Sequence, residues 1–60
     1  MNVTNDGSNI RISSTFQETA ALVEAVGKGA AEYRREGSIE LAEEAEQIAD
    51  QLRNPKLKLD

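Results

Sequence analysis

Residues 33–41 read YRREGSIEL, and this stretch decides how the chain folds. Gly37 readily takes the left-handed backbone at which helices end, and Ser38 directly after it is a favourable cap for a new helix. A turn this short between two helices brings them back side by side. The stretch therefore predicts an antiparallel helical hairpin.

The segment before this turn predicts an amphipathic helix over residues 14–36. Ser14 and Thr15 are each followed three residues later by a glutamine or a glutamate, so either hydroxyl fits a capping box. Apolar residues then recur at helical spacing in two neighbouring rows, which together cover about half of the helix circumference. The first row is Phe16, Ala20, Val23, Gly27 and Ala30, and the second is Leu22, Val26 and Tyr33.

The segment after the turn predicts a second helix over residues 38–54. Glutamates fill its first turns, where the positive end of the helix dipole favours them, and Arg53 is in its last turn, where the preference reverses. Asn54-Pro55 ends this helix, because proline disfavours helical backbone in the residue before it. Its apolar stripe, which we expect to pack on the second row of the first helix, is Leu41, Ala45, Ile48 and Leu52, flanked by Ala42 and Ala49.

The N-terminal residues 1–13 read as turns around short extended pieces. Asparagine, aspartate, glycine and serine gather at positions 5–9, between Val3 and the alternating stretch that follows. Ile10 and Ile12 share one face of a strand, because side chains alternate along extended backbone. The pattern predicts a short strand or a small β-hairpin here.

The C-terminal residues 55–60 form an extended tail in the predicted fold. The alternating stretch Lys56-Leu57-Lys58-Leu59 could be a second short strand, antiparallel to residues 10–13. The chain 1–60 is then a single small domain of the mainly α class, or a fragment of a longer chain. No internal repeat is visible.

The glycines Gly27 and Gly29, on either side of Lys28, raise the question of a phosphate site. A phosphate-binding loop needs a different glycine spacing and a preceding strand, and neither is found here. Each glycine inside a helix costs about 1 kcal/mol relative to alanine. We expect Gly27 to let a second helix backbone come close and Gly29 to lie on the outer face; a kink or break in the helix is the alternative.

Composition argues against most chemical functions. The chain has no histidine and no cysteine, which removes disulfides, the usual nucleophile–base pairs and most structural metal sites. Residues 5–9 offer oxygen atoms but lack the ligand spacing of a calcium loop. Residues Glu40, Glu43, Glu44 and Glu46 are expected on a solvated face. We expect no enzymatic activity, no catalytic residues, no cofactor and no metal.

Charge and hydropathy limit the partners. The net charge of −4 lacks the basic face of a nucleic-acid binder. No apolar run is long enough to span a bilayer, and the N-terminus MNVTNDGSN lacks the features of a secretion signal. We therefore expect a cytoplasmic protein that binds neither nucleic acid nor membranes.

A shortage of core leads to the functional prediction. A domain of 60 residues buries only about 60% of the surface that its unfolded chain exposes, and this one has no disulfide to supplement its core. We therefore expect a protein–protein interaction module that self-associates, as a homodimer or a higher helical assembly. The predicted interface is Phe16, Ala20, Val23, Gly27, Ala30, Ile10 and Ile12.

Two alternatives stay open. The same apolar arc could bind a different protein, as in a small inhibitor or adaptor that stays monomeric until its partner is added. A strand followed by two helices also resembles the element order of ribbon-helix-helix repressors, which dimerise through that strand and lay it on DNA. The longer first helix, the single arginine of the strand and the negative net charge depart from that pattern. Which row of the first helix faces the second helix is also left open.

Overall fold

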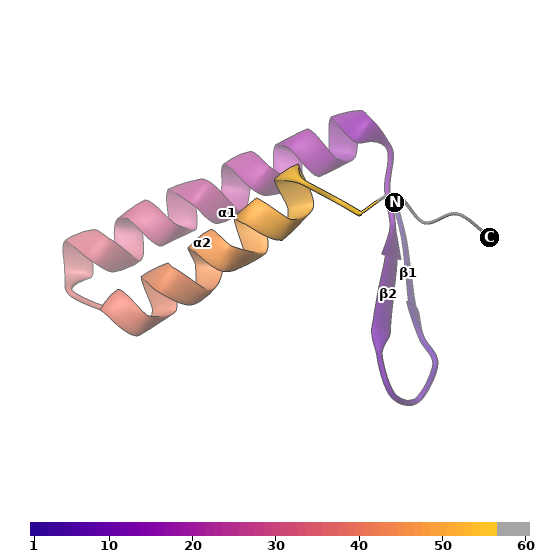
Figure 1. Cartoon of the computed structure of the whole chain (residues 1–60), viewed down its shortest axis with the longest axis horizontal. Coiled ribbons are helices and arrows are strands. Elements are labelled where there is room, and N and C mark those ends of the chain that lie inside the picture. Colours follow the sequence, from indigo (N-terminus) through magenta and orange to yellow (C-terminus); the bar gives the residue numbers. More distant parts are fainter. Residues whose placement is uncertain (57–60) are drawn as a thin grey trace.

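A computed structural model describes residues 1–56, and it shows a β-hairpin followed by two packed helices (Figure 1). The strands are β1 (Asn2–Asn5) and β2 (Ile10–Ser13), and the helices are α1 (Phe16–Glu36) and α2 (Ile39–Arg53). The predicted class, a mainly α helical hairpin with an N-terminal β-hairpin, is confirmed. The C-terminal strand predicted over residues 56–59 lies outside the described residues, except for Lys56, which is not in a strand.

Thr15 caps the start of α1. Its hydroxyl oxygen accepts a hydrogen bond from the Glu18 N–H at 3.1 Å, and its own N–H donates to the Glu18 carboxylate at 2.9 Å. This reciprocal pair satisfies two backbone donors that would otherwise have no partner in the first turn. The other candidate cap, Ser14, instead shares a 2.6 Å hydrogen bond with the hydroxyl of Thr19.

We expect Thr15→Ala to lower the free energy of unfolding by about 1 kcal/mol, because the Glu18 N–H loses its acceptor. Urea unfolding followed by far-UV circular dichroism measures the loss. Gln17→Ala, an exposed change in the same turn, is the matched control and should have an effect close to zero. Equal losses in the two variants would show that the cap does not stabilise the helix.

The turn between the helices has the form that the sequence predicts. Gly37 has a φ of 87°, in the left-handed region that glycine adopts without steric cost. Its N–H donates to the Arg34 carbonyl at 3.1 Å, and the Ser38 N–H donates to the Tyr33 carbonyl at 2.8 Å. These two bonds close the end of α1. Ser38 precedes α2 as predicted, but its hydroxyl forms no capping bond, because its ψ of 70° departs from the extended backbone of a capping residue.

The two helices pack through small residues. Among the described residues, the buried positions are Ala30 of α1 and Ala42 and Ala49 of α2, with exposures of 2%, 0% and 4%. Half-buried residues extend the line of buried positions along each helix at spacings of three and four residues, as in helices that pack along their length. In α1 they are Thr19, Leu22, Val23, Val26, Gly29 and Tyr33, and in α2 they are Ala45 and Leu52. Larger side chains of α1 thus lie over a row of alanines.

The predicted apolar stripe of α2 is partly wrong. Leu41 and Ile48, expected in the interface, are 49% and 45% exposed, whereas their neighbours Ala42 and Ala49 are buried. Ala45 and Leu52 are half-buried as predicted, so the packing face of α2 keeps two of its four predicted positions and exchanges the other two for the neighbouring alanines. Leucine and isoleucine dominate a hydrophobic pattern, but alanines let the helices approach more closely, which increases the dispersion contacts between them.

The two rows of α1 also divide differently from the prediction. Leu22, Val26 and Tyr33 are half-buried, as expected for residues that face α2. Ala30, which was expected in a seam between chains, is 2% exposed within a single chain and so belongs to the α1–α2 interface. Gly29, expected on the outer face, is half-buried, and α1 continues through both glycines without a break.

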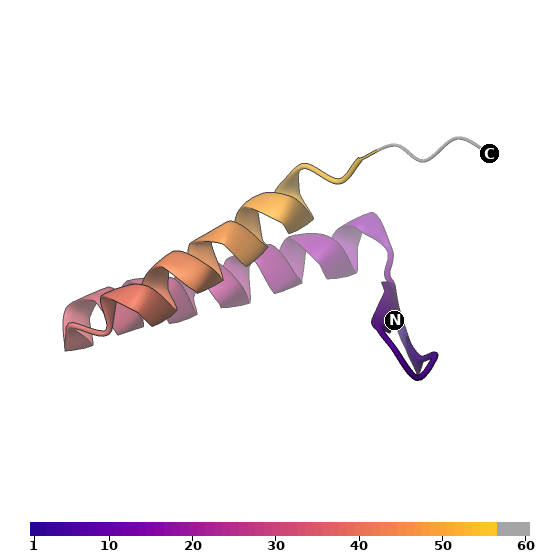
Figure 2. The same ribbon diagram turned by 60° about the horizontal axis from the view of Figure 1, so that its bottom comes forward.

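The β-hairpin stands apart from the helices. It projects at a steep angle from the start of α1, at the end of the helix pair opposite the Gly37 turn, which we call the open end (Figures 1 and 2). Within residues 1–56 the strands pack on neither helix, although the Met1 amino group, directly before β1, forms an ion pair with the Glu18 carboxylate of α1 at 2.7 Å. The radius of gyration is consequently 13.2 Å, compared with about 10 Å for a compact chain of this length.

Candidate interaction surface

Side chains in its own turn shape the β-hairpin. The Asp6 carboxylate accepts hydrogen bonds from the N–H groups of Asn9 and Ser8 at 2.8 and 2.9 Å. Gly7 takes the positive φ that the turn requires, 93°. The Asn9 and Ser8 bonds, followed by the Arg11 guanidinium 3.0 Å away, hold the pKa of Asp6 below its usual value. The turn is thus held in one shape, which fixes how the two strands pair.

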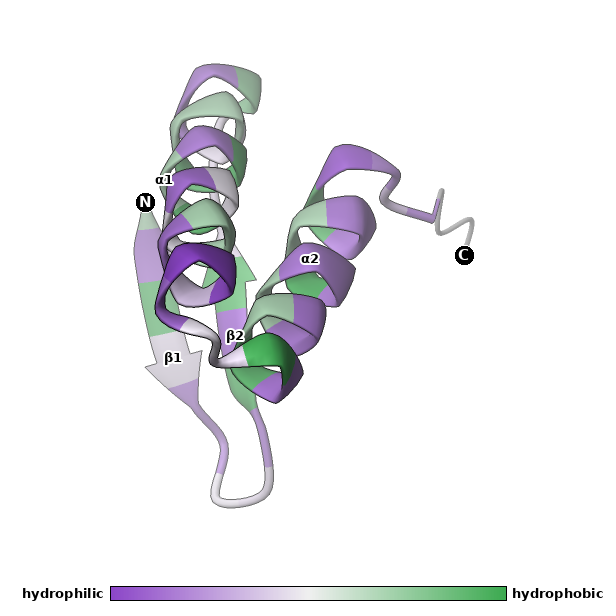
Figure 3. Ribbon diagram, turned by 90° about the vertical axis from the view of Figure 1, so that its left-hand side faces the viewer, coloured by the Kyte–Doolittle hydropathy of each residue, from purple (hydrophilic) through white to green (hydrophobic). Residues whose placement is uncertain are grey.

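The register of the strands gathers apolar side chains on one face. Val3 lies opposite Ile12, and Asn5 lies opposite Ile10. Residues directly opposite each other point to the same side of a sheet, as do residues two apart along a strand. Figure 3 shows the resulting alternation of apolar and polar residues along the strands. We call Val3, Ile10 and Ile12 the hairpin apolar face.

The hairpin apolar face is open to solvent. Val3, Ile10 and Ile12 are 56%, 61% and 56% exposed, and no element within residues 1–56 covers them. A two-stranded hairpin alone is marginally stable in water, and it becomes stable when an apolar face packs on further strands or on a helix. This face would therefore gain stability from a second surface that covered it.

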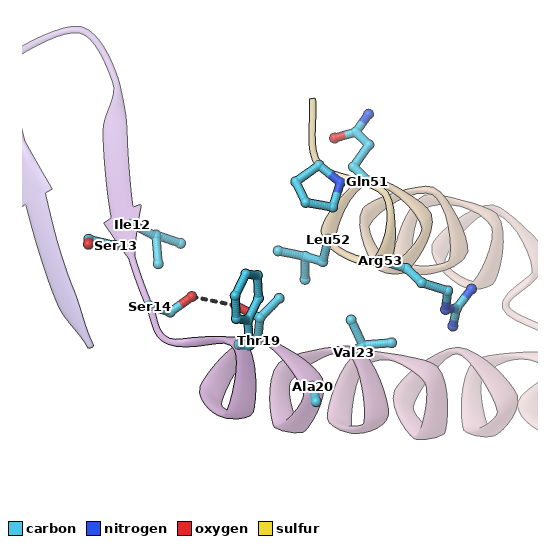
Figure 4. A pocket seen from close by; sticks show the side chains of 11 residues that line it. Ile12, Ser13, Ser14, Thr19, Ala20, Val23, Gln51, Leu52 and Arg53 are labelled. Carbon is cyan, nitrogen blue, oxygen red and sulfur yellow. Dashed lines mark hydrogen bonds between the residues drawn. The ribbon is translucent and has the colours of Figure 1, made fainter. Parts of the chain in front are cut away.

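A cleft of about 760 Å³ lies between the hairpin and the open end of the helix pair (Figure 4). Ile12 of β2 and Leu52 of α2 face it from opposite sides, and Val23 points into it from α1. Phe16, 93% exposed, also lines it. The residues that line this open-end cleft are Ile12, Ser13, Ser14, Phe16, Thr19, Ala20, Val23, Gln51, Leu52, Arg53 and Pro55. Because Ile12 belongs to both, the cleft and the hairpin apolar face form one continuous apolar surface.

Most of the predicted interface residues lie on this continuous surface. They are Ile10, Ile12, Phe16, Ala20 and Val23. Gly27 is exposed farther along α1, outside the cleft, and a side chain built at this position would meet no atom within 4 Å in the single chain. Ala30 is buried between the helices. No close approach of α2 to Gly27 therefore occurs within the chain.

Val3, Leu52 and Pro55 lie on the surface but were not in the predicted interface. Val3 is the single apolar residue of β1, so no alternating pattern could identify its face. Its position follows from the register, which depends on the geometry of the turn. Leu52 was assigned to the helix interface, where it is half-buried, and its remaining surface lines the cleft.

A bidentate ion pair joins the outer sides of the two helices. The Nε and Nη2 groups of Arg34 donate to the two carboxylate oxygens of Glu46 at 2.7 and 2.6 Å. These bonds raise the pKa of Arg34 and hold the pKa of Glu46 below its usual value. Both side chains are 47% exposed, so solvent screening keeps the stabilisation small. Glu46 is exposed, as expected for the solvated glutamate face, and it also pairs with an arginine of the other helix.

We expect this ion pair to make the stability depend on pH in acid. The pKa of Glu46 is lower in the folded chain than its ordinary value of 4.5. The ion pair therefore contributes fully to the free energy of unfolding above the pKa that Glu46 has in the unfolded chain. This contribution is lost as the pH falls through the lower pKa that Glu46 has in the folded chain. Glu46→Gln should consequently lose less stability than the wild type between about pH 5 and pH 3.

Urea unfolding at the two pH values measures the difference. Glu44→Gln is the matched control, because Glu44 is also an exposed residue of α2 but makes no ion pair among the described residues. It should keep the pH dependence of the wild type. The same acid dependence in Glu46→Gln and the wild type would contradict a role for the ion pair.

The described residues contain neither a cluster of metal-ligating side chains nor a helix that could span a membrane. No three carboxylates within residues 1–56 are grouped so that they could hold a metal ion. Neither helix in the described part of the chain combines the length and the apolar content needed to cross a bilayer. No protein-family model matches the chain, and no curated protein or solved structure matches it either. A functional proposal therefore depends on the continuous apolar surface itself.

Proposed function

We propose that this protein is a non-enzymatic interaction module that self-associates. The observation that carries the proposal is the continuous apolar surface made of the hairpin apolar face and the open-end cleft. Within residues 1–56 this surface has no cover, and the buried apolar residues are all alanines. A second protein surface would supply the apolar burial that the single chain lacks.

The area exposed by one chain supports this proposal. The chain exposes 5250 Å², whereas a compact monomer of 6.5 kDa exposes about 3,800 Å². The excess is about 1,400 Å². This excess is spread over the whole elongated chain, and it exceeds the roughly 800 Å² that each partner contributes to a stable interface. The proposal includes a cytoplasmic location.

Molar mass measured against concentration tests the proposal. Sedimentation equilibrium over a dilution series that reaches about 100 μM should show a mass that rises from one chain toward two. The helix signal in far-UV circular dichroism, recorded on the same samples, shows that the chain stays folded. A mass of one chain at every concentration would contradict self-association. A monomer that bound only when a different protein was added would instead indicate an inhibitor or adaptor.

A further inference from the structure

We infer, on the basis of the proposed self-association, that two copies stack their hairpin apolar faces on each other, so that each hairpin lies in the open-end cleft of the other chain. A two-fold dimer requires one self-complementary patch, because the same residues then contact each other from both sides. The hairpin apolar face and the cleft meet at Ile12 and provide such a patch.

The direction of the hairpin apolar face makes this stacking geometrically consistent. Ile12 faces the cleft from one side and Leu52 faces it from the other (Figure 4), so the apolar face looks into the cleft of its own chain. When the hairpin of a second chain lies in that cleft with its apolar face toward the first hairpin, the two apolar faces meet. Sheets that stack in this way interlock their apolar side chains at a separation of about 10 Å. The exposed ring of Phe16 would then border the contact.

The open end also keeps the electrostatic cost of a dimer low. A net charge of −4 opposes association if the unpaired carboxylates lie at the contact. Near the cleft, however, Asp50 is paired with Arg53 at 3.2 Å. In the hairpin, Asp6 is paired with Arg11 at 3.0 Å. The glutamates at the start of α2 are near the Gly37 turn, at the opposite end of the helix pair. When a second copy docks at the open end, these glutamates of the two chains stay far apart, and salt screens the repulsion that remains between them.

Leu41 and Ile48, one α2 heptad apart, provide an internal comparison. They are 49% and 45% exposed, similar to the residues of the hairpin apolar face, but they lie on a different element among glutamates. If apolar exposure alone decided where two chains meet, the hairpin apolar face and the surface of Leu41 and Ile48 would serve equally well. The inference distinguishes them, because the hairpin face adjoins the open-end cleft of about 760 Å³, whereas Leu41 lines a smaller hollow of about 320 Å³ beside the Gly37 turn.

Site-directed cross-linking tests the arrangement. The chain contains no cysteine, so a single introduced cysteine reports on one position. Val3→Cys places the two thiols on facing surfaces of the stacked hairpins, and a short bis-maleimide should join them into covalent dimers. Ile48→Cys is the matched control on α2. We expect a several-fold higher dimer yield for Val3→Cys, and a yield that falls on dilution.

A charge substitution provides a second readout that does not depend on cross-linking chemistry. Ile12→Asp should raise the concentration needed for dimerisation at least about tenfold, because it would bury two like charges in the stacked faces. The helix signal should stay unchanged, since the hairpin does not pack on the helices within the described chain. Ile48→Asp should leave dimerisation unchanged.

The possible failures are distinguishable. A dimer that cross-links at Ile48 but not at Val3, or that tolerates Ile12→Asp, would preserve self-association and overturn the stacked-hairpin arrangement. A wild-type chain that remains a monomer throughout the dilution series would overturn the proposed function itself.

Discussion

Ala42→Leu should lower the free energy of unfolding by about 1–3 kcal/mol. Ala42 is fully buried between α1 and α2, with 0% exposure, so the extra atoms of leucine have no space unless the helices move apart. Separation would also weaken the contacts of Ala49 on the same face of α2. A domain this small rarely has more than about 3–5 kcal/mol of stability from its core, so a measurable fraction of the variant should be unfolded in buffer.

Ala31→Leu is the matched control for this experiment. It makes the same chemical change at an exposed position of α1, and its effect should stay within about 0.5 kcal/mol. Urea unfolding of both variants at one fixed protein concentration measures the two effects. A loss of similar size in Ala31→Leu, or full stability in Ala42→Leu, would contradict close packing of the helices through alanines.

Replacing both Gly27 and Gly29 with alanine should stabilise the chain by about 2 kcal/mol, or about 1 kcal/mol for each change. Neither glycine has a positive φ, and a Cβ at either position would meet no atom within 4 Å. Alanine therefore adds helix propensity and restricts the unfolded chain, with no steric cost in the single chain. Thermal unfolding of the two single variants and the double variant measures the gain.

Gly37→Ala should have the opposite effect and serves as the comparison. Its φ of 87° lies in the left-handed region, where a Cβ costs roughly 1–2 kcal/mol. The dimer affinity of Gly27→Ala should also be measured, because the sequence predicts a close approach of another helix at this residue. A variant with the expected stability but weaker dimerisation would place Gly27 in the contact between chains. A loss of stability in Gly27→Ala at low concentration would contradict the free space around it.

The parts of the fold that depend on backbone chemistry could be predicted from the sequence. The end of α1 follows from Gly37, the one residue type that enters the left-handed region freely, and its start follows, to within one residue, from the capping-box spacing that Ser14 and Thr15 both fit. These signals act over a few residues, so they do not depend on the rest of the molecule. The end of α2 before Pro55 is local in the same sense.

The packing face of α2 could not be predicted from its hydrophobic pattern. Leu41 and Ile48 are the most apolar choice for the interface, but the choice between them and Ala42 and Ala49 depends on the side chains that α1 presents opposite them. Steric fit across two helices is a property of the pair, and a single-helix pattern does not contain it. The same reasoning applies to the open-end cleft, which exists because of the angle between the hairpin and α1.

The strands of the β-hairpin do not pack on the helix pair within the described chain, and the exposed ion pair between the Met1 amino group and Glu18 links the two parts at 2.7 Å, so the hairpin can open largely independently of the helices. Backbone amides in β1 and β2 should exchange with solvent hydrogen quickly in dilute solution, whereas amides in the middle of α1 and α2 should exchange only when the helix pair opens. A bound partner that covers the hairpin apolar face would slow exchange in the strands far more than in the helices. Hydrogen exchange in the strands would then report how much of the protein is bound.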